Sequence, residues 1–101
     1  MPIFVMLTRL SPELLRNPQT MEDFECQAME HIRKVCPQVE WLHNYAVFGP
    51  YDYLDIFTAP DNETATRVSI LIRTYGRAHS EIWPATEWIK FKETLRGLSE
   101  K

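Results

Sequence analysis

The Gly49-Pro50 turn constrains the fold more than any other feature of the chain, because it joins two segments with strand composition. Residues 39–48 and 51–59 are rich in β-branched and aromatic side chains, and each segment stops at a turn residue or a proline. A Gly-Pro dipeptide between such segments is typical of a tight turn. The sequence therefore predicts an antiparallel hairpin near the middle of the chain.

Helical patterns flank this hairpin on both sides. Apolar residues recur at three- and four-residue spacing over residues 21–35 and again over residues 61–75. Two further strands are predicted outside the helices, at residues 3–8 and 77–83. The order strand, helix, strand, strand, helix, strand predicts an α+β, ferredoxin-like βαββαβ sandwich. In this fold a four-stranded antiparallel sheet carries two helices on one face.

One more amphipathic helix is predicted at residues 86–98, as a C-terminal extension of a single domain that spans residues 1–101. Its apolar residues include Trp88, Ile89 and Leu95, which could cover a sheet edge or clasp a partner.

Charge and cysteine placement narrow the classes of partner and compartment. The net charge is −3 and no predicted face gathers Lys and Arg, so we expect neither nucleic acid nor a membrane as a partner. Cys26 and Cys36 lie ten residues apart in one predicted helix, which separates them by about 15 Å. That distance excludes a disulfide between them and favours reduced thiols in a cytoplasmic protein.

The sequence resembles the GYD domain family over about residues 3–83, with the terminal helix outside the resemblance. The residues that carry it are Phe48–Asp52 (FGPYD), Ala59–Asp61 (APD), Gly76 and the opening stretch MLTRLSPELLRNP. The resemblance implies a fold of the dimeric α/β-barrel type, in which two sheets pair through their helix-free faces. It thus implies a homodimer or a larger even oligomer, and it supplies no established activity.

Strand alternation sorts the remaining candidates onto one face of the sheet. With a three-residue loop around Gly49, His43 and Asp55 share the helix-free face, whereas a two-residue loop would separate them. We prefer the longer loop because it groups the aliphatic residues under the helices. The side chains then expected on the helix-free face are Trp41, His43, Tyr45, Tyr53, Asp55, Phe57, His79, Glu81 and Trp83.

Such a face permits three interpretations. The first is a pocket between the sheet and a partner for a small apolar or aromatic molecule, in which the polar groups orient the ligand. Its ligand-binding residues would be Trp41, Tyr45, Tyr53, Phe57 and Trp83. The third is an assembly module that binds no ligand, and the second is an enzyme, described in the next paragraph.

The second interpretation is a cofactor-independent enzyme of the dimeric barrel type, acting by proton transfer as an isomerase or a monooxygenase does. His79 or His43 would be the base, with Asp55 or Glu81 as its partner. His43, His79 and Glu81 could also form a two-His-one-carboxylate metal site, but their spacing does not distinguish it from ordinary strand residues. We therefore expect no metal and no cofactor.

Overall fold

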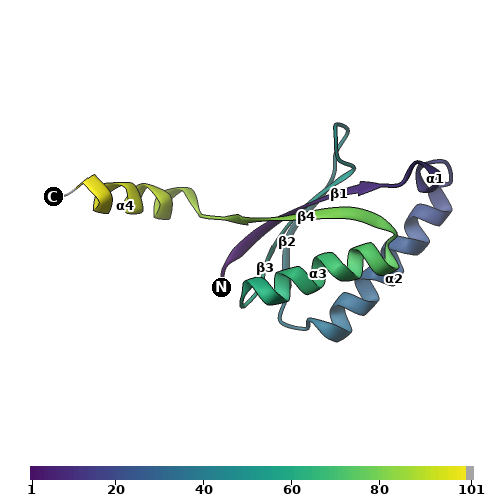
Figure 1. The fold of residues 1–101 in the computed structure, drawn as a ribbon, viewed down its shortest axis with the longest axis horizontal. Helices are drawn as coiled ribbons and strands as arrows, with labels where there is room; N and C mark the ends of the chain where they lie inside the picture. Colours follow the sequence, from purple (N-terminus) through teal and green to yellow (C-terminus); the bar gives the residue numbers. More distant parts are fainter. Residues whose placement is uncertain (100–101) are drawn as a thin grey trace.

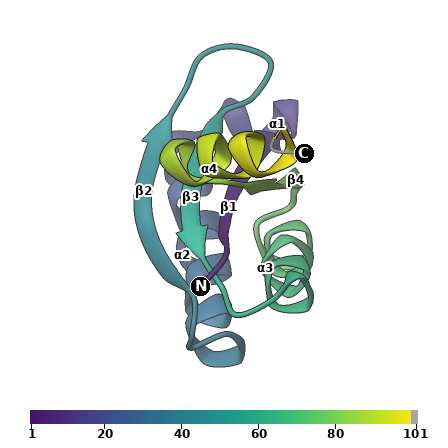
Figure 2. The same cartoon turned by 90° about the vertical axis from the view of Figure 1, so that its left-hand side faces the viewer.

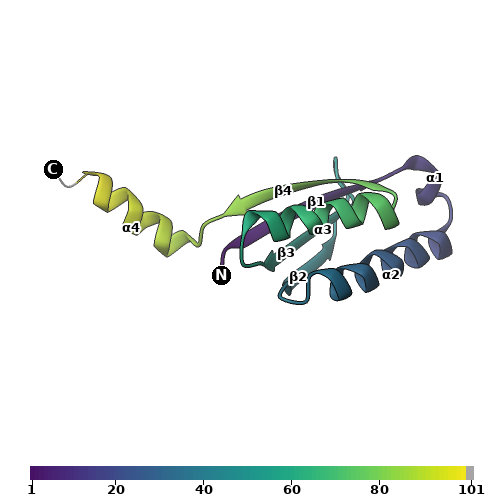
Figure 3. The same cartoon turned by 60° about the horizontal axis from the view of Figure 1, so that its bottom comes forward.

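The computed structural model describes residues 1–99 and contains a four-stranded sheet with two long helices on one face (Figures 1 and 3). The strand order is β2-β3-β1-β4, and all neighbouring strands are antiparallel. This arrangement confirms the ferredoxin-like α+β fold. The elements are β1 (Ile3–Leu10), α1 (Pro12–Leu15), α2 (Pro18–Val35), β2 (Glu40–Ala46), β3 (Tyr53–Thr58), α3 (Asn62–Tyr75), β4 (Ala78–Ala85) and α4 (Trp88–Ser99).

Both long helices begin at a side-chain cap. The Asn17 side chain accepts hydrogen bonds from the backbone N–H groups of Gln19 and Thr20, so α2 starts at Pro18, earlier than the apolar pattern predicts. Asp61 Oδ1 accepts from the Thr64 N–H at 2.8 Å and from the Thr64 hydroxyl at 2.7 Å. These bonds satisfy amide donors of the first turn, which have no partner inside a helix.

The core lies between the sheet and these helices. Its largest side chain from β3 is Phe57, whose ring lies 5.7 Å from Phe4 and 5.1 Å from Trp41, between ring centroids. The buried residues of the cluster are Phe4, Met6, Ile32, Cys36, Phe57, Ala59, Ala65 and Val68. Cys36 is thus a core thiol, whereas Cys26 is exposed, and both are free.

The two helices meet at small residues and leave part of the sheet uncovered. A Cβ atom on Gly76 would lie 2.7 Å from the Ile72 carbonyl oxygen and 3.6 Å from the Ala28 Cβ of α2. Gly76 therefore permits a close approach rather than a left-handed turn, and the left-handed residue is Arg77, with φ of 51°. In the described residues α3 packs closely on β4, whereas α2 packs on α3 and stands farther from β2 and β3.

The β2–β3 loop is longer than predicted. It spans residues 47–52, because Asp52 binds the end of β1 instead of extending β3. Its backbone N–H donates to the Thr8 carbonyl at 2.8 Å, and its carboxylate accepts the Leu10 N–H at 2.7 Å. Val47 N–H closes the loop on the Asp52 carbonyl. The expected three-residue loop is therefore wrong.

A β-bulge at Leu42 changes the alternation within β2. Trp41 lies opposite Phe57 and faces the helices, but His43 lies opposite Ile56 and faces away from them. Leu42 is the extra residue between them, and a bulge of this kind places two residues of one strand opposite one of the other. Two residues expected on the same face thus lie on opposite faces.

The last strand and helix extend beyond the sandwich. β4 continues through Pro84, which pairs with Phe4 on β1, so the strand passes its predicted end at residue 83. Proline is tolerated here because β4 is an edge strand. The Glu87 carboxylate then accepts hydrogen bonds from the backbone N–H groups of Ile89 and Lys90 at the start of α4. Figures 1 and 3 show α4 projecting past the end of the sheet, so that it lies in front of the strands in the end-on view of Figure 2. All its described residues are exposed. No helix within residues 1–99 is long and apolar enough to span a bilayer.

Candidate functional site

The nine residues predicted for the helix-free face divide between the two faces of the sheet. Asp55 pairs with Met6, which is buried under the helices, so Asp55 lies on the helix side. The same register places Tyr53 and Phe57 there. For these three residues and for Trp41 the predicted face is wrong. The six-residue loop and the Leu42 bulge change which residues of β2 and β3 point toward the helices. His43, Tyr45, His79, Glu81 and Trp83 lie on the face opposite the helices, as predicted.

A cleft of about 410 Å³ lies between α2 and the sheet, where the helix does not pack closely on the strands. We call it the α2 cleft. Three of the misplaced residues, Trp41, Tyr53 and Asp55, line it, and Tyr45 borders it from the edge strand. The full lining is Met6, Thr8, Leu10, Met21, Glu25, Ala28, Met29, Trp41, Asn44, Tyr45, Ala46, Tyr53, Asp55, Ile72, Gly76 and Ala78.

Asp55 is the charged group of the sheet wall. Its carboxylate accepts a hydrogen bond of 2.7 Å from the Asn44 side-chain amide on β2. Burial raises the pKa of Asp55 above its ordinary value of 3.8, the Asn44 hydrogen bond partly opposes this, and the Glu25 carboxylate on α2 adds to it. Burial and the nearby carboxylates likewise raise the pKa of Tyr53. Negative charge in the cleft is thus unfavourable in the protein alone.

Asp55→Asn should therefore stabilise the protein near neutral pH. A carboxyl whose pKa is raised by folding contributes its stability below about pH 4, and that contribution is lost as the pH rises through the folded-state pKa. The amide is neutral throughout, so we expect a higher melting temperature for the variant at pH 7 and equal values below the ordinary Asp pKa. Thermal unfolding of both proteins across this range tests the sign, and a lower melting temperature at pH 7 would contradict it.

Thr8, a lining residue of the same cleft, has a buried hydroxyl without a partner in the described part of the chain. Its side chain is 2% exposed, and within residues 1–99 its Oγ1 makes no hydrogen bond. A buried polar atom without a partner costs free energy, which is why such atoms are rare in folded proteins and point to a ligand or a strained site. Thr58 Oγ1 is similarly unsatisfied, but Thr58 does not line the cleft.

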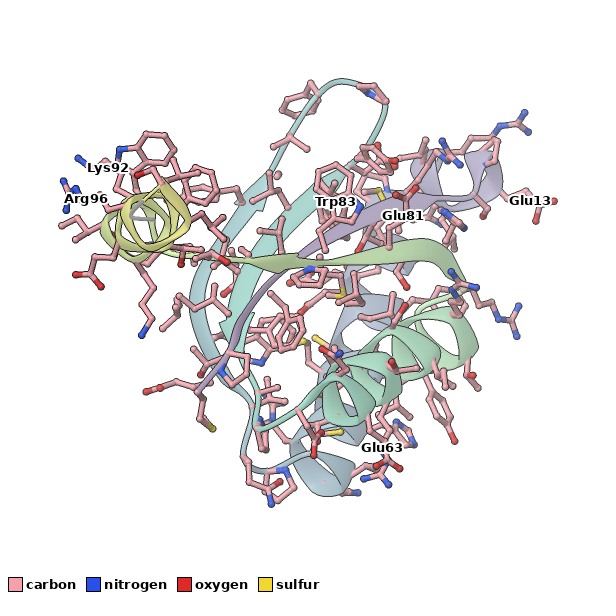
Figure 4. All side chains as sticks on the ribbon, turned by 60° about the vertical axis from the view of Figure 1, so that its left-hand side comes forward. Glu13, Glu63, Glu81, Trp83, Lys92 and Arg96 are labelled. Atoms are coloured by element: carbon pink, nitrogen blue, oxygen red, sulfur yellow. The ribbon has the colours of Figure 1, made fainter. Side chains whose placement is uncertain are left out.

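On the helix-free face, hereafter the open face, polar contacts gather around Glu81. Its carboxylate accepts hydrogen bonds from the Tyr51 hydroxyl at 2.6 Å and from the Trp83 indole at 3.2 Å, with His79 Nε2 3.4 Å away. The Tyr51 bond, followed by that of Trp83, lowers the pKa of Glu81, and the bond to Glu81 raises the pKa of Tyr51. Glu81 is thus held as an anion with its oxygens already engaged, and Figure 4 shows it beside Trp83 on the side of β4 away from α3.

His43 does not join this group. It lies on edge strand β2 and stacks on Tyr45, with ring centroids 5.9 Å apart. His79 and Glu81 lie on the opposite edge strand, β4, three strand spacings or about 14 Å away. Within residues 1–99 no group of three His, Cys, Asp or Glu side chains could hold a metal ion. The pairing of His79 with Glu81 predicted for proton transfer is present. His79, but not Glu81, also lines a second cavity of about 840 Å³, beside the end of β1 and the β2–β3 loop.

Sequence reasoning missed the α2 and β1 walls of the cleft. Thr8, Met21, Glu25 and Met29 were not candidates, although Glu25 falls on the apolar stripe of α2, four residues from both methionines. An acidic residue on a core-facing helix stripe is a signal that could have identified the site.

Comparison with solved structures supports the fold. The leucine response regulatory protein (LrpA) of Mycobacterium tuberculosis is similar with a TM-score of 0.58 and 16% identity, over 85% of this chain and 51% of that one. This chain thus spans about half the length of LrpA, and at this identity the likeness concerns the fold alone. No curated protein matches the sequence.

The GYD domain family model matches residues 4–95. The match passes residue 83 and enters α4, so the expectation that the terminal helix lies outside the resemblance is wrong. Because the model matches most of the chain, this protein belongs to the GYD domain family.

Proposed function

We propose that this protein is a homo-oligomer that binds a small molecule in the α2 cleft, rather than on the open face as the sequence suggests. The observation that carries the proposal is Thr8, which lines the cleft and whose buried hydroxyl makes no hydrogen bond within residues 1–99. Asp55 adds a second polar group on the same wall. A mostly apolar cavity with a few convergent polar groups is the usual form of a small-molecule site.

The size and shape of the cleft suit such a ligand. Its volume of about 410 Å³ lies within the range of roughly 300–1,000 Å³ typical of ligand pockets. Met21 and Met29 supply flexible apolar contacts from α2, and Trp41 and Tyr53 supply rigid aromatic surface from the sheet. A leucine response protein with this fold is a precedent for small-molecule response, which we extend to this chain as part of the proposal.

The oligomer accounts for two apolar surfaces that a single chain leaves in water. The open face exposes 49% of Trp83 and half-buries Val5, Leu54 and Ile56. The second surface is α4, which has 12 residues, a length at which an isolated helix is marginal in water. The radius of gyration of 15.7 Å exceeds the roughly 13 Å expected for a compact chain of this length. A second copy that covers the open face and contacts α4 would bury both surfaces.

Thr8→Val tests the cleft, because valine has the same shape and lacks the hydroxyl. We expect the variant to be more stable by about 1 kcal/mol, since an unsatisfied buried group is removed. We expect its affinity for a cleft ligand to fall about tenfold, since a ligand hydrogen bond is lost. A small-molecule library screened by thermal shift supplies the ligand, and calorimetry measures its affinity for each variant.

Thr58→Val is the matched control. It also removes an unsatisfied buried hydroxyl but lies outside the cleft, so it should stabilise the fold and leave affinity unchanged. Equal losses of affinity in both variants, or ligands whose binding ignores Thr8→Val, would show that the ligand binds elsewhere.

A further inference from the structure

We infer that the ligand of the α2 cleft is a cation, an ammonium group on a largely apolar body. The inference rests on the proposed function and adds the chemical class of the ligand. It stands on the two acidic residues that line the cleft from opposite walls and on Thr8, a lining residue whose buried hydroxyl has no partner within residues 1–99.

The charges of the cleft are all of one sign. Of the lining side chains, only Glu25 and Asp55 are carboxylic acids, and the lining includes no Lys, Arg or His among residues 1–99. The two acids come from opposite walls, since Glu25 belongs to α2 and Asp55 to β3. They also influence each other, because the Glu25 charge contributes to the raised pKa of Asp55. A cation between the walls would be attracted to both.

An anionic ligand faces the reverse situation. It would bring another negative charge beside the half-buried Asp55 and the exposed Glu25, and like charges repel, most strongly at the half-buried group. None of the 11 arginines and lysines of the chain is among the residues that line the cleft. The charge pattern thus discriminates against carboxylates and phosphates.

The remaining lining suits the other parts of an ammonium ligand. The lone pairs of Thr8 Oγ1 can accept an N–H, so an ammonium would satisfy the hydroxyl that the described residues leave without a partner. The rings of Trp41 and Tyr53 offer π faces of the kind that bind cations, and the methionines pack against an aliphatic or aromatic body. Asn44 holds the Asp55 carboxylate in place with its 2.7 Å hydrogen bond.

Three probes of one shape separate the chemical classes. Benzylamine, benzyl alcohol and benzoate share a ring of the same size but carry a cation, a neutral hydroxyl and an anion. We expect calorimetry on the intact protein at pH 7 to show benzylamine binding about tenfold more tightly than benzyl alcohol, and benzoate binding more weakly still. Asp55→Asn and Glu25→Gln should each reduce benzylamine affinity about tenfold and change benzyl alcohol affinity little. Glu22→Gln removes an acid from an exposed position of the same helix outside the cleft and should change neither.

Proton release gives a readout that does not depend on affinity alone. A bound cation favours the ionised form of Asp55 and lowers its pKa toward the ordinary value, so benzylamine binding near the folded-state pKa should release protons. The groups facing Asp55 are Asn44 on β2, Glu25 on α2 and Tyr53 on β3, and the last remains protonated in this range. The release appears as a binding heat that depends on the ionisation enthalpy of the buffer, and it should vanish in Asp55→Asn.

The outcomes separate this inference from the proposed function. If benzyl alcohol and benzoate bind as tightly as benzylamine and all lose affinity in Thr8→Val, the cleft is a binding site but the cation assignment is wrong. If none of the probes binds at millimolar concentration and no screened compound responds to Thr8→Val, both proposals fail. Selective benzylamine binding with proton release supports both.

Discussion

Ile56→Glu is expected to convert the proposed oligomer into monomers. Ile56 lies on β3, one of the two central strands, and it faces the open side of the sheet. In the proposed two-fold interface each substitution occurs twice, because such an interface uses the same patch of both subunits. Each uncompensated buried charge costs about 3–5 kcal/mol, so the two charges together would raise the dissociation constant by at least roughly two to four orders of magnitude. Native mass spectrometry and sedimentation across a concentration series measure the change.

Ile70→Glu is the matched control for this substitution. Ile70 is 52% exposed on α3, on the helix layer, so the same chemical change there should leave the oligomer intact. The single subunits of Ile56→Glu should still fold, because the introduced carboxylate is half exposed once the partner is absent. An oligomer that survives Ile56→Glu, or a wild-type protein that is monomeric at every concentration, would show that the open face is not the interface.

Phe57→Ala is expected to have the largest effect on stability. Phe57 is 0% exposed and its ring contacts Phe4 and Trp41 in the core. Replacing a buried Phe with Ala costs about 3–5 kcal/mol, through lost burial and the cavity left behind. A domain of this size has a total stability of roughly 5–15 kcal/mol, so the melting temperature should fall by more than about 12 °C.

This substitution also decides between the predicted and observed roles of Phe57. If the Phe57 side chain packs the core, the affinity of the folded variant for a ligand should change little. If Phe57 instead contacts the ligand, the variant should lose affinity with only a modest change in stability. Phe48→Ala provides the comparison, because Phe48 is 100% exposed in the β2–β3 loop and its replacement should leave the melting temperature unchanged. Chemical denaturation of both variants measures the two free energies of unfolding.

The order and type of the elements could be predicted from the sequence, since local signals determine them. Asp61 caps α3 as its place before a helical stripe indicates, and the Gly-Pro dipeptide lies in the loop of the hairpin. The spacing of apolar residues in both helices predicts which side of each helix faces the sheet. The structure buries the residues on those sides, among them Ala28, Ile32, Ala65 and Val68. These features depend on residues within a few positions of each other.

The site could not be predicted in the same way, because the faces of a strand depend on residues far away in the chain. The phase of β3 is fixed by its pairing with β1 and by the bonds of Asp52 to Thr8 and Leu10, more than 40 positions away. An error of one residue in the hairpin transfers Asp55 to the other face. The α2 cleft also needs the helix packing at Ala28 and Gly76, which composition does not report.

The Leu42 bulge affects how relatives of this protein should be compared. A homologue that lacks the extra residue of the bulge could keep all the remaining side chains of β2 on their present faces, because the bulge accommodates one additional residue without shifting the rest of the strand. An alignment that placed the gap a few columns away would match residues of the cleft with residues of the open face, the proposed subunit interface. Any covariation or substitution pattern drawn from those columns would then mix selection for the proposed binding site with selection for the proposed interface. Aligning GYD proteins by structure at this strand, before reading conservation from it, keeps the two kinds of constraint apart.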